Sequence, residues 1–143
     1  MAKLERSITI NAPVEKVFNY ASDPNNHPEF WPSVVEVKDV KRLPNGGYSH
    51  RFVYKMAGVR FEGTSEQTEY VPNQRFVDKS TGGIDATLDW GFQPEDGGTK
   101  ITVEAEYTVP VPVLGKVAEA IVVKLNANEA EAILANLKAR MEA

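Results

Sequence analysis

Large apolar and aromatic residues recur at every second position in several segments between residues 48 and 107, and this spacing constrains the fold more than any other feature. Side chains alternate between the two faces of a β-strand, so residues two apart share a face. When neighbouring segments are paired through their turns, the largest residues fall on one face of a predicted sheet. They are Tyr48, Phe52, Tyr54, Phe61, Phe76, Leu88, Trp90, Phe92 and Tyr107. This face needs a cover, and it either lines a ligand cavity or forms a solid core.

The turn sequences between these segments predict how the strands pair. Dipeptides such as Asn45-Gly46 and Asp96-Gly97 favour two-residue hairpin turns. Around Asn45-Gly46 the predicted pairs are Lys41 with His50 and Asp39 with Phe52, and around Ala57-Gly58 they are Phe52 with Gly63 and Tyr54 with Phe61. A turn at Pro72-Asn73 pairs Gln67 with Asp78, and a three-residue loop at Thr81-Gly82-Gly83 pairs Phe76 with Leu88. The turn at Asp96-Gly97 pairs Trp90 with Val103. The last turn also sets Asp89 against Glu104, a like-charge pair, so a two-residue shift or a bulge stays open there.

The remaining segments predict one further strand and three helical regions. Residues 3–10 alternate as a half-buried strand, and Pro13 suits the first turn of a short amphipathic helix. A second helical turn or structured loop is expected at residues 28–32, where prolines bracket two aromatic residues. Residues 113–142 carry a broad apolar side, which predicts one long helix. At about 1.5 Å per residue, that helix is long enough to cover the whole sheet.

Composition excludes several classes of function. A chain of 143 residues that is 42% hydrophobic fits one domain spanning residues 1–143. With 16 basic and 20 acidic residues and no block of like charge, no nucleic-acid footprint is expected. No stretch is long enough for a transmembrane segment, and a cytoplasmic protein is the default expectation. Because the chain has no cysteine and two histidines, we expect neither a metal site nor a cofactor.

Motifs at both ends of the chain resemble one known superfamily. The opening motifs are Asn-Ala-Pro-Val-Glu-Lys-Val-Phe at residues 11–18, Ser-Asp-Pro at 22–24 and Phe-Trp-Pro at 30–32. The closing ones are Trp-Gly-Phe at 90–92, Gly-Gly-Thr-Lys at 97–100, residues 110–115 and Asn-Leu-Lys at 136–138. Together they resemble START-like SRPBCC proteins, particularly the polyketide cyclase/dehydrase and coenzyme-Q-binding branch.

This resemblance implies an α+β, helix-grip fold. In that fold a curved seven-stranded antiparallel sheet wraps around a long C-terminal helix, and two short helices follow the first strand. Members of the superfamily carry lipids, bind quinones, hormones or polyketides, cyclise or dehydrate substrates, or act through protein contacts. The resemblance therefore leaves the function open, and the site has to be argued from side chains.

A smaller polar group accompanies the aromatic residues on the inward face. His50, Ser65, Gln67, Asp78 and Ser80 fall on neighbouring strands, with Asp39 and Lys41 expected beside them. Buried polar groups are costly unless they are hydrogen-bonded. The group is therefore either a recognition site for the polar end of a ligand or a sheet end that faces water. As weak catalytic candidates, His50 would act as a general base and Asp78 would orient it. His27 is expected to cap a helix or line the rim.

The leading hypothesis is binding or carriage of a hydrophobic or aromatic small molecule, such as a lipid, quinone or polyketide-like compound. The expected ligand contacts are Phe30, Trp31, His50, Phe52, Tyr54, Phe61, Gln67, Phe76, Asp78, Leu88, Trp90, Tyr107, Val117, Ile121 and Leu125. One alternative is a cyclase/dehydrase enzyme acting in the same cavity, and another is a protein-interaction module that uses Phe30 and Trp31. A cavity of about 300 Å³ or more would suit a drug-sized ligand, and a much smaller one would favour ordinary core.

Overall fold

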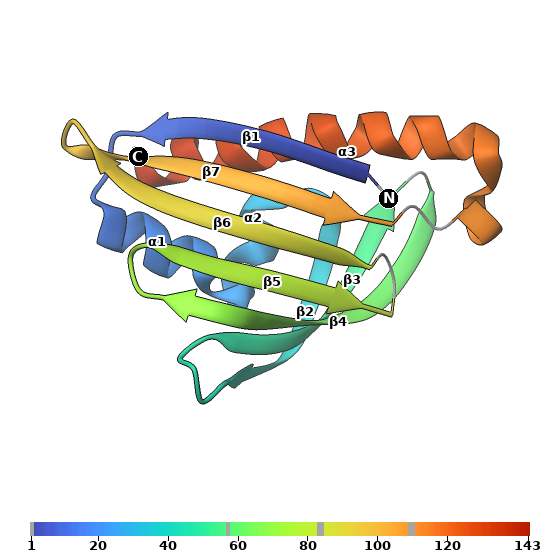
Figure 1. Ribbon diagram of the computed structural model, residues 1–143, viewed down its shortest axis with the longest axis horizontal. Coiled ribbons are helices and arrows are strands. Elements are labelled where there is room, and N and C mark those ends of the chain that lie inside the picture. The colour runs from blue at the N-terminus through green and yellow to red at the C-terminus, as the bar shows by residue number, and fades with distance from the viewer. Residues whose placement is uncertain (1, 57, 83–84, 109–110) are drawn as a thin grey trace.

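Seven antiparallel strands form one curved sheet, and a long C-terminal helix lies along it (Figure 1). The structure is a computed structural model that describes residues 2–56, 58–82, 85–108 and 111–143, without the side chains of residues 2, 56, 59, 111–123, 125 and 126. The strand order is β1-β7-β6-β5-β4-β3-β2. The predicted helix-grip fold is confirmed.

The helices and strands follow the predicted order along the chain. They are β1 (Ala2–Ile10), α1 (Val14–Ser22), the 3-10 helix η1 (Pro24–Asn26), α2 (His27–Phe30), β2 (Val34–Arg42), β3 (Tyr48–Met56), β4 (Val59–Val71), β5 (Arg75–Thr81), β6 (Ala86–Glu95), β7 (Gly98–Tyr107) and α3 (Val111–Met141). Pro13 occupies the N-cap position of α1, and the Asp23 side chain caps η1 by accepting from the backbone N–H of Asn25. Within the described residues, no helix combines the length and apolar content needed to span a bilayer.

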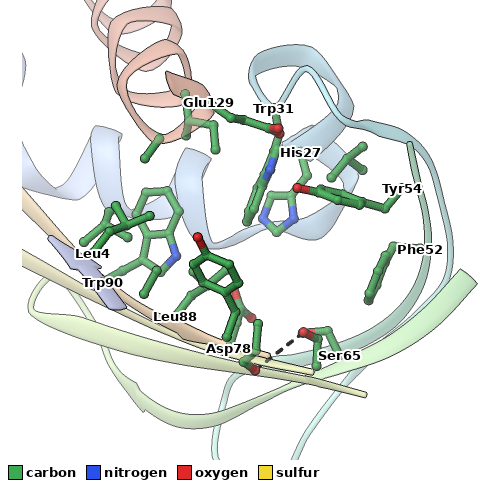
Figure 2. Close-up of a pocket in the computed structure, with 18 of the residues that line it drawn as sticks. Leu4, His27, Trp31, Phe52, Tyr54, Ser65, Asp78, Leu88, Trp90 and Glu129 are labelled. Carbon is green, nitrogen blue, oxygen red and sulfur yellow. Dashed lines mark hydrogen bonds between the residues drawn. The ribbon is translucent and has the colours of Figure 1, made fainter. Parts of the chain in front are cut away.

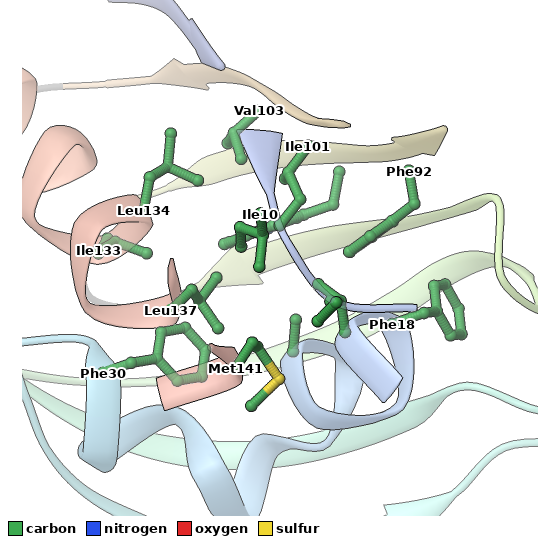
Figure 3. Close-up of a cluster of buried hydrophobic side chains, with 14 of the residues drawn as sticks. Ile10, Phe18, Phe30, Phe92, Ile101, Val103, Ile133, Leu134, Leu137 and Met141 are labelled. Atoms are coloured by element: carbon green, nitrogen blue, oxygen red, sulfur yellow. The ribbon is translucent and has the colours of Figure 1, made fainter. Parts of the chain in front are cut away.

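The core lies between the sheet, the C-terminal half of α3 and the short helix α1 (Figure 3). Phe18 of α1 is fully buried, and its ring contacts Phe76 and Phe92 edge-on at 5.9 and 5.1 Å between centroids. The buried residues that α3 contributes are Ile133, Leu134, Leu137 and Met141. Burial of this apolar surface holds α3 on the sheet.

Two of the predicted hairpins have the register that the sequence indicates. Tyr54 pairs with Phe61 between β3 and β4, and Trp90 pairs with Val103 between β6 and β7. The like-charge pair of Asp89 and Glu104 is also present without any shift. Arg75 on β5 explains why, because its guanidinium donates to both carboxylate oxygens of Asp89 at 2.9 and 2.7 Å. That bidentate contact offsets the repulsion across the pair.

The predicted register between β2 and β3 is wrong. Lys41 pairs with Ser49 instead of His50, and Val37 takes the place opposite Phe52 that Asp39 was expected to fill. A bulge interrupts β2 between Lys38 and Lys41, where Asp39 has a left-handed φ of 54°. Asp39 and Lys41 are consequently exposed and lie outside the inward polar group.

The turn after β2 is also longer than predicted. Residues 43–47 form the loop, which the backbone N–H of Leu43 closes by donating to the carbonyl of Gly47 at 2.8 Å. The Asn45 side chain accepts from the backbone N–H of Gly47 within this loop. Asparagine side chains often accept a hydrogen bond from the backbone N–H two residues later. This contact stabilises the observed loop in place of the predicted two-residue turn.

Two further connections differ from the prediction without changing the inward face. Gln67 pairs with Asp78 as predicted, but a bulge follows and the turn contains residues 72–74 instead of Pro72-Asn73 alone. Between β5 and β6 the three-residue loop is wrong, since Phe76 pairs with Trp90 and not with Leu88. The two rings stack at 5.5 Å, which favours the observed register. Gly83 and Ile84 lie outside the described residues.

The start of β7 leaves no room for a side chain at Gly98. A Cβ atom built on Gly98 would lie 2.4 Å from the backbone carbonyl oxygen of Ile10, whereas one on Gly91 would meet nothing closer than 3.8 Å. Gly98→Ala should therefore lower the free energy of unfolding by about 1–3 kcal/mol, because β1 and β7 must separate. Urea denaturation checks this, with Gly91→Ala as the matched control. Equal losses in the two variants would contradict the close approach of β1 and β7.

Candidate ligand-binding cavity

A cavity of about 130 Å³ lies between the inward face of the sheet and α3 (Figure 2). Its wall is mostly apolar and draws on all seven strands, on α2 and on the C-terminal half of α3. The lining residues are Leu4, His27, Trp31, Val34, His50, Phe52, Tyr54, Ser65, Asp78, Ser80, Ala86, Leu88, Trp90, Val103, Ala105, Tyr107, Glu129, Ala130, Ile133 and Leu134. Strands therefore supply one side of the cavity and helices the other.

Three side chains on the sheet side of this wall carry buried polar atoms without a hydrogen-bond partner among the described residues. They are His50 Nδ1, Asp78 Oδ1 and Trp90 Nε1. Buried polar atoms in folded proteins are nearly always paired, so each exception needs an explanation. All three residues line one cavity, so the cavity presents three polar atoms with which a molecule inside it can form hydrogen bonds.

Two histidines meet at this part of the wall. The rings of His27 on α2 and His50 on β3 lie 5.6 Å apart and nearly perpendicular. The Nε2 of His27 lies 3.1 Å from the carbonyl oxygen of Ala21, so Nε2 carries the proton. Burial lowers the pKa of His27 to about 3, helped by the neighbouring His50 and opposed by the Ala21 carbonyl. Burial also lowers the pKa of His50 to about 4. Both rings are therefore neutral near pH 7.

Asp78 is the carboxyl group on the sheet side of the cavity. Its side chain points inward from β5 and is 4% exposed. Burial raises the pKa of this carboxyl to about 7, although a hydrogen bond from Gln67 acts in the opposite direction. An ordinary aspartate has a pKa of about 4. Near neutral pH, Asp78 therefore exists in both its protonated and its ionised form.

A second carboxyl group, Glu129, enters the cavity from α3. It fastens the segment between α2 and β2, because Ser33 donates its backbone N–H at 3.1 Å and its hydroxyl to the two carboxylate oxygens. Burial raises the pKa of Glu129, and the hydrogen bonds from Ser33 oppose that shift. In Figure 2, Glu129 lies across the cavity from Asp78, with Trp31 and Tyr54 beside it.

The structure brings together about half of the side chains that the sequence indicated. The predicted contacts that line the cavity are Trp31, His50, Phe52, Tyr54, Asp78, Leu88, Trp90 and Tyr107. Phe30, Phe61, Gln67 and Phe76 are buried outside the lining. The side chains of Val117, Ile121 and Leu125 lie outside the described residues.

The predicted contacts outside the lining have structural positions instead. Gln67 donates to the carbonyl of Ser22 at 2.7 Å and accepts from the backbone N–H of Tyr48 at 3.0 Å, so it ties α1 to the sheet. Phe30 and Phe76 belong to the apolar core. Their inward position was predicted correctly, but core packing takes up the space around them.

Several lining residues were absent from the predicted contacts. Glu129 and Leu4 lie on α3 and β1, near opposite ends of the chain. Neither element belongs to a predicted hairpin, so the turn sequences do not determine where it meets the rest of the sheet. One signal was available for Glu129, because it lies four residues after Leu125 and four residues before Ile133, so its carboxyl group falls on the apolar side of the predicted helix. His27 was expected to cap a helix or line the rim, and it lines the wall.

The size of the cavity limits what it can hold. A volume of about 130 Å³ is below the roughly 300 Å³ of drug-sized pockets and close to the about 150 Å³ apolar cavity known to bind benzene. A single ring or a short chain therefore fits, whereas a long lipid tail or a polyketide would have to displace lining side chains. Ordinary core does not account for the site either, since core polar atoms would be paired.

One family has a sequence profile that matches nearly the whole chain. The profile is described as polyketide cyclase / dehydrase and lipid transport, and it matches residues 1–142. The chain belongs to this family. The predicted resemblance to the polyketide cyclase/dehydrase branch of START-like proteins is thereby confirmed. No curated protein matches the sequence.

Solved structures share the polyketide cyclase/dehydrase fold at low sequence identity. Protein TTHA0849 from Thermus thermophilus has a TM-score of 0.84 at 23% identity, over 98% of this chain and 97% of that one. A START superfamily protein from Mycobacterium smegmatis has a TM-score of 0.77 at 17% identity, over 98% and 97% of the chains. The Zhui aromatase/cyclase from Streptomyces sp. R1128 has a TM-score of 0.76 at 16% identity, over 99% and 96%. At such identities the likeness shows the fold alone.

The raised pKa of Asp78 predicts how stability depends on pH in this family member. The folded protein binds the Asp78 proton more tightly than the unfolded chain does, so ionisation destabilises the wild type as the pH rises from about 4 to about 7. Asp78→Asn keeps the shape and cannot ionise. Relative to the wild type, its free energy of unfolding should rise by a few kcal/mol over this range, because each pKa unit is worth about 1.4 kcal/mol.

Urea unfolding of both proteins at several pH values measures this difference. The lowered pKa values of His27 and His50 act in the opposite direction, but they act in both proteins and cancel. Asp85→Asn, at an exposed position, serves as the matched control and should show no such trend. A difference between Asp78→Asn and the wild type that is flat with pH would contradict a desolvated carboxyl group.

Proposed function

We propose that this protein binds a small hydrophobic molecule in the cavity between the sheet and α3. The apolar wall would supply most of the affinity, and the group formed by His50, Asp78 and Trp90 would bind the polar end of the ligand. The observation that carries the proposal is the presence of three unpartnered, buried polar atoms, among the described residues, on the wall of one apolar cavity. Membership of a family described by cyclisation, dehydration and lipid transport supports it.

A second candidate function is a reaction of the cyclase/dehydrase kind on a ligand in the same cavity. Asp78 favours it, because a carboxyl group whose pKa is about 7 exchanges protons readily at neutral pH. His50 is less suited to act as the base that the sequence suggested, because its pKa is lowered to about 4. Turnover that disappears in Asp78→Asn while ligand binding persists would support the enzyme.

The third hypothesis, a protein-interaction module built on Phe30 and Trp31, has less support. Phe30 is 1% exposed and packs in the core, so it is not available to another protein. Trp31 is half-buried, lines the cavity and contacts Trp90 at 6.2 Å between ring centroids. Both side chains therefore face the interior.

Filling the cavity should abolish binding without unfolding the protein. Ala105 lies on β7 with its side chain toward the cavity, opposite Leu4 and Leu88 on the neighbouring strands. Ala105→Leu adds three carbon atoms there, so we expect loss of ligand with equal or higher thermal stability. Native mass spectrometry of the purified proteins and thermal shifts with a panel of small aromatic, quinone and lipid compounds measure both effects.

The matched control is Ala135→Leu, which introduces the same side chain at an exposed position of α3. This variant should retain the ligand and the thermal shifts of the wild type. Two results would contradict the proposal. One is unchanged binding by Ala105→Leu, and the other is a wild-type protein that carries no small molecule and shows no shift with any compound.

A further inference from the structure

We propose that the cavity is selective for a hydrophobic primary amine, whose ammonium group pairs with the carboxylate of Asp78. This inference rests on the proposed function and adds the charge and the polar group of the ligand to it. The volume of about 130 Å³ sets the size of the apolar part at about one ring. Benzylamine is the simplest molecule of this class and serves as the probe.

The charges on the wall of the cavity favour a cation. Asp78 projects from the sheet and Glu129 from α3, and there is no lysine or arginine among the described residues that line the cavity. His27 and His50 are neutral near pH 7 because burial lowers the pKa of each ring. Among the charged side chains that the structure describes in the lining, an anionic ligand would therefore meet carboxyl groups alone, whereas a cation would meet a charge of opposite sign.

Asp78 differs from Glu129 in lacking a partner for one of its oxygens. Both oxygens of Glu129 accept from Ser33, but Asp78 Oδ1 is buried and has no partner among the described residues. An unpaired carboxylate is costly to bury, and the cost falls when a cation binds it directly. The raised pKa of Asp78 reflects this cost in the unliganded protein. An ammonium group at Asp78 would therefore be bound more strongly than at Glu129.

The number of hydrogen-bond donors also favours a primary amine over an alcohol. His50 Nδ1 accepts a hydrogen bond when the ring proton is on Nε2, so the wall of the cavity then holds a second unpaired acceptor, besides Asp78 Oδ1, among the described residues. An ammonium group has three donors, so it can pair with Asp78 and still donate to further acceptors of the wall, whereas a hydroxyl has one donor. The rings of Trp31 and Trp90 add aromatic surface, which attracts cations. The remaining donor, Trp90 Nε1, would favour amines that also carry an oxygen.

Isothermal titration calorimetry at pH 7.5 with benzylamine, benzyl alcohol and benzoate tests the inference. These probes share one ring and differ in charge. We expect the wild type to bind benzylamine roughly tenfold or more tightly than benzyl alcohol, because a charge-assisted hydrogen bond replaces a neutral one. Benzoate should give no measurable binding. Asp78→Asn should remove the preference for benzylamine over benzyl alcohol, and the exposed control Asp85→Asn should keep that preference.

The outcomes separate this inference from the function on which it rests. Equal affinities of the wild type for benzylamine and benzyl alcohol would overturn the amine preference and leave hydrophobic binding intact. An affinity for benzylamine as high in Asp78→Asn as in the wild type would also overturn the amine preference and leave hydrophobic binding intact. If none of the three probes binds to the wild type, the proposed function itself is contradicted for ligands of this size. If Asp78→Asn does not fold, the relative affinities of the wild type for the three probes test the amine preference by themselves.

Discussion

Ile133, Leu134 and Leu137 of α3 pack against the inward face of the curved sheet, and the rest of the structure depends on that contact. Seven strands with one apolar face could not persist in water without such a cover. The same contact closes the cavity, because Ile133 and Leu134 also line it. Glu129 lies one helical turn before Ile133 and fastens α3 to the segment at Ser33. Fold and cavity are thus held by the same half of one helix.

The inward face changes character along its length, and that change defines the site. Near α1 the face is filled by stacked and edge-on rings such as Phe76 and Phe92, with no space between them for a ligand. Farther along β5, Asp78 follows Phe76 on the same face, and the cavity begins there. The aromatic residues thus serve two purposes, since some form the core and others form the wall. A buried carboxyl group, with an oxygen unpaired among the described residues, marks the boundary between the two regions.

The sequence predicted the fold and most of the inward face because both follow from period-two spacing. A shift in register by two residues leaves that face unchanged, whereas a shift by one residue reverses it. The hairpins at Ala57-Gly58 and Asp96-Gly97 were predicted residue by residue, since tight glycine turns determine their registers. The β2 hairpin was not, because the left-handed conformation of Asp39 has no clear signal in sequence. His50 and Asp78 were predicted to share the site. Glu129 was not, because its place depends on how α3 docks.

The central claim is that Asp78 lies desolvated in a cavity, with an oxygen that a polar group of a ligand can bind. The most direct test is the pKa of this carboxyl group, measured by carbon-detected NMR titration of the unliganded protein and assigned with Asp78→Asn. A desolvated Asp78 should show a pKa of about 7. A value near that of an ordinary aspartate, about 4, would mean that the carboxyl group is hydrated or already paired, and would contradict the account.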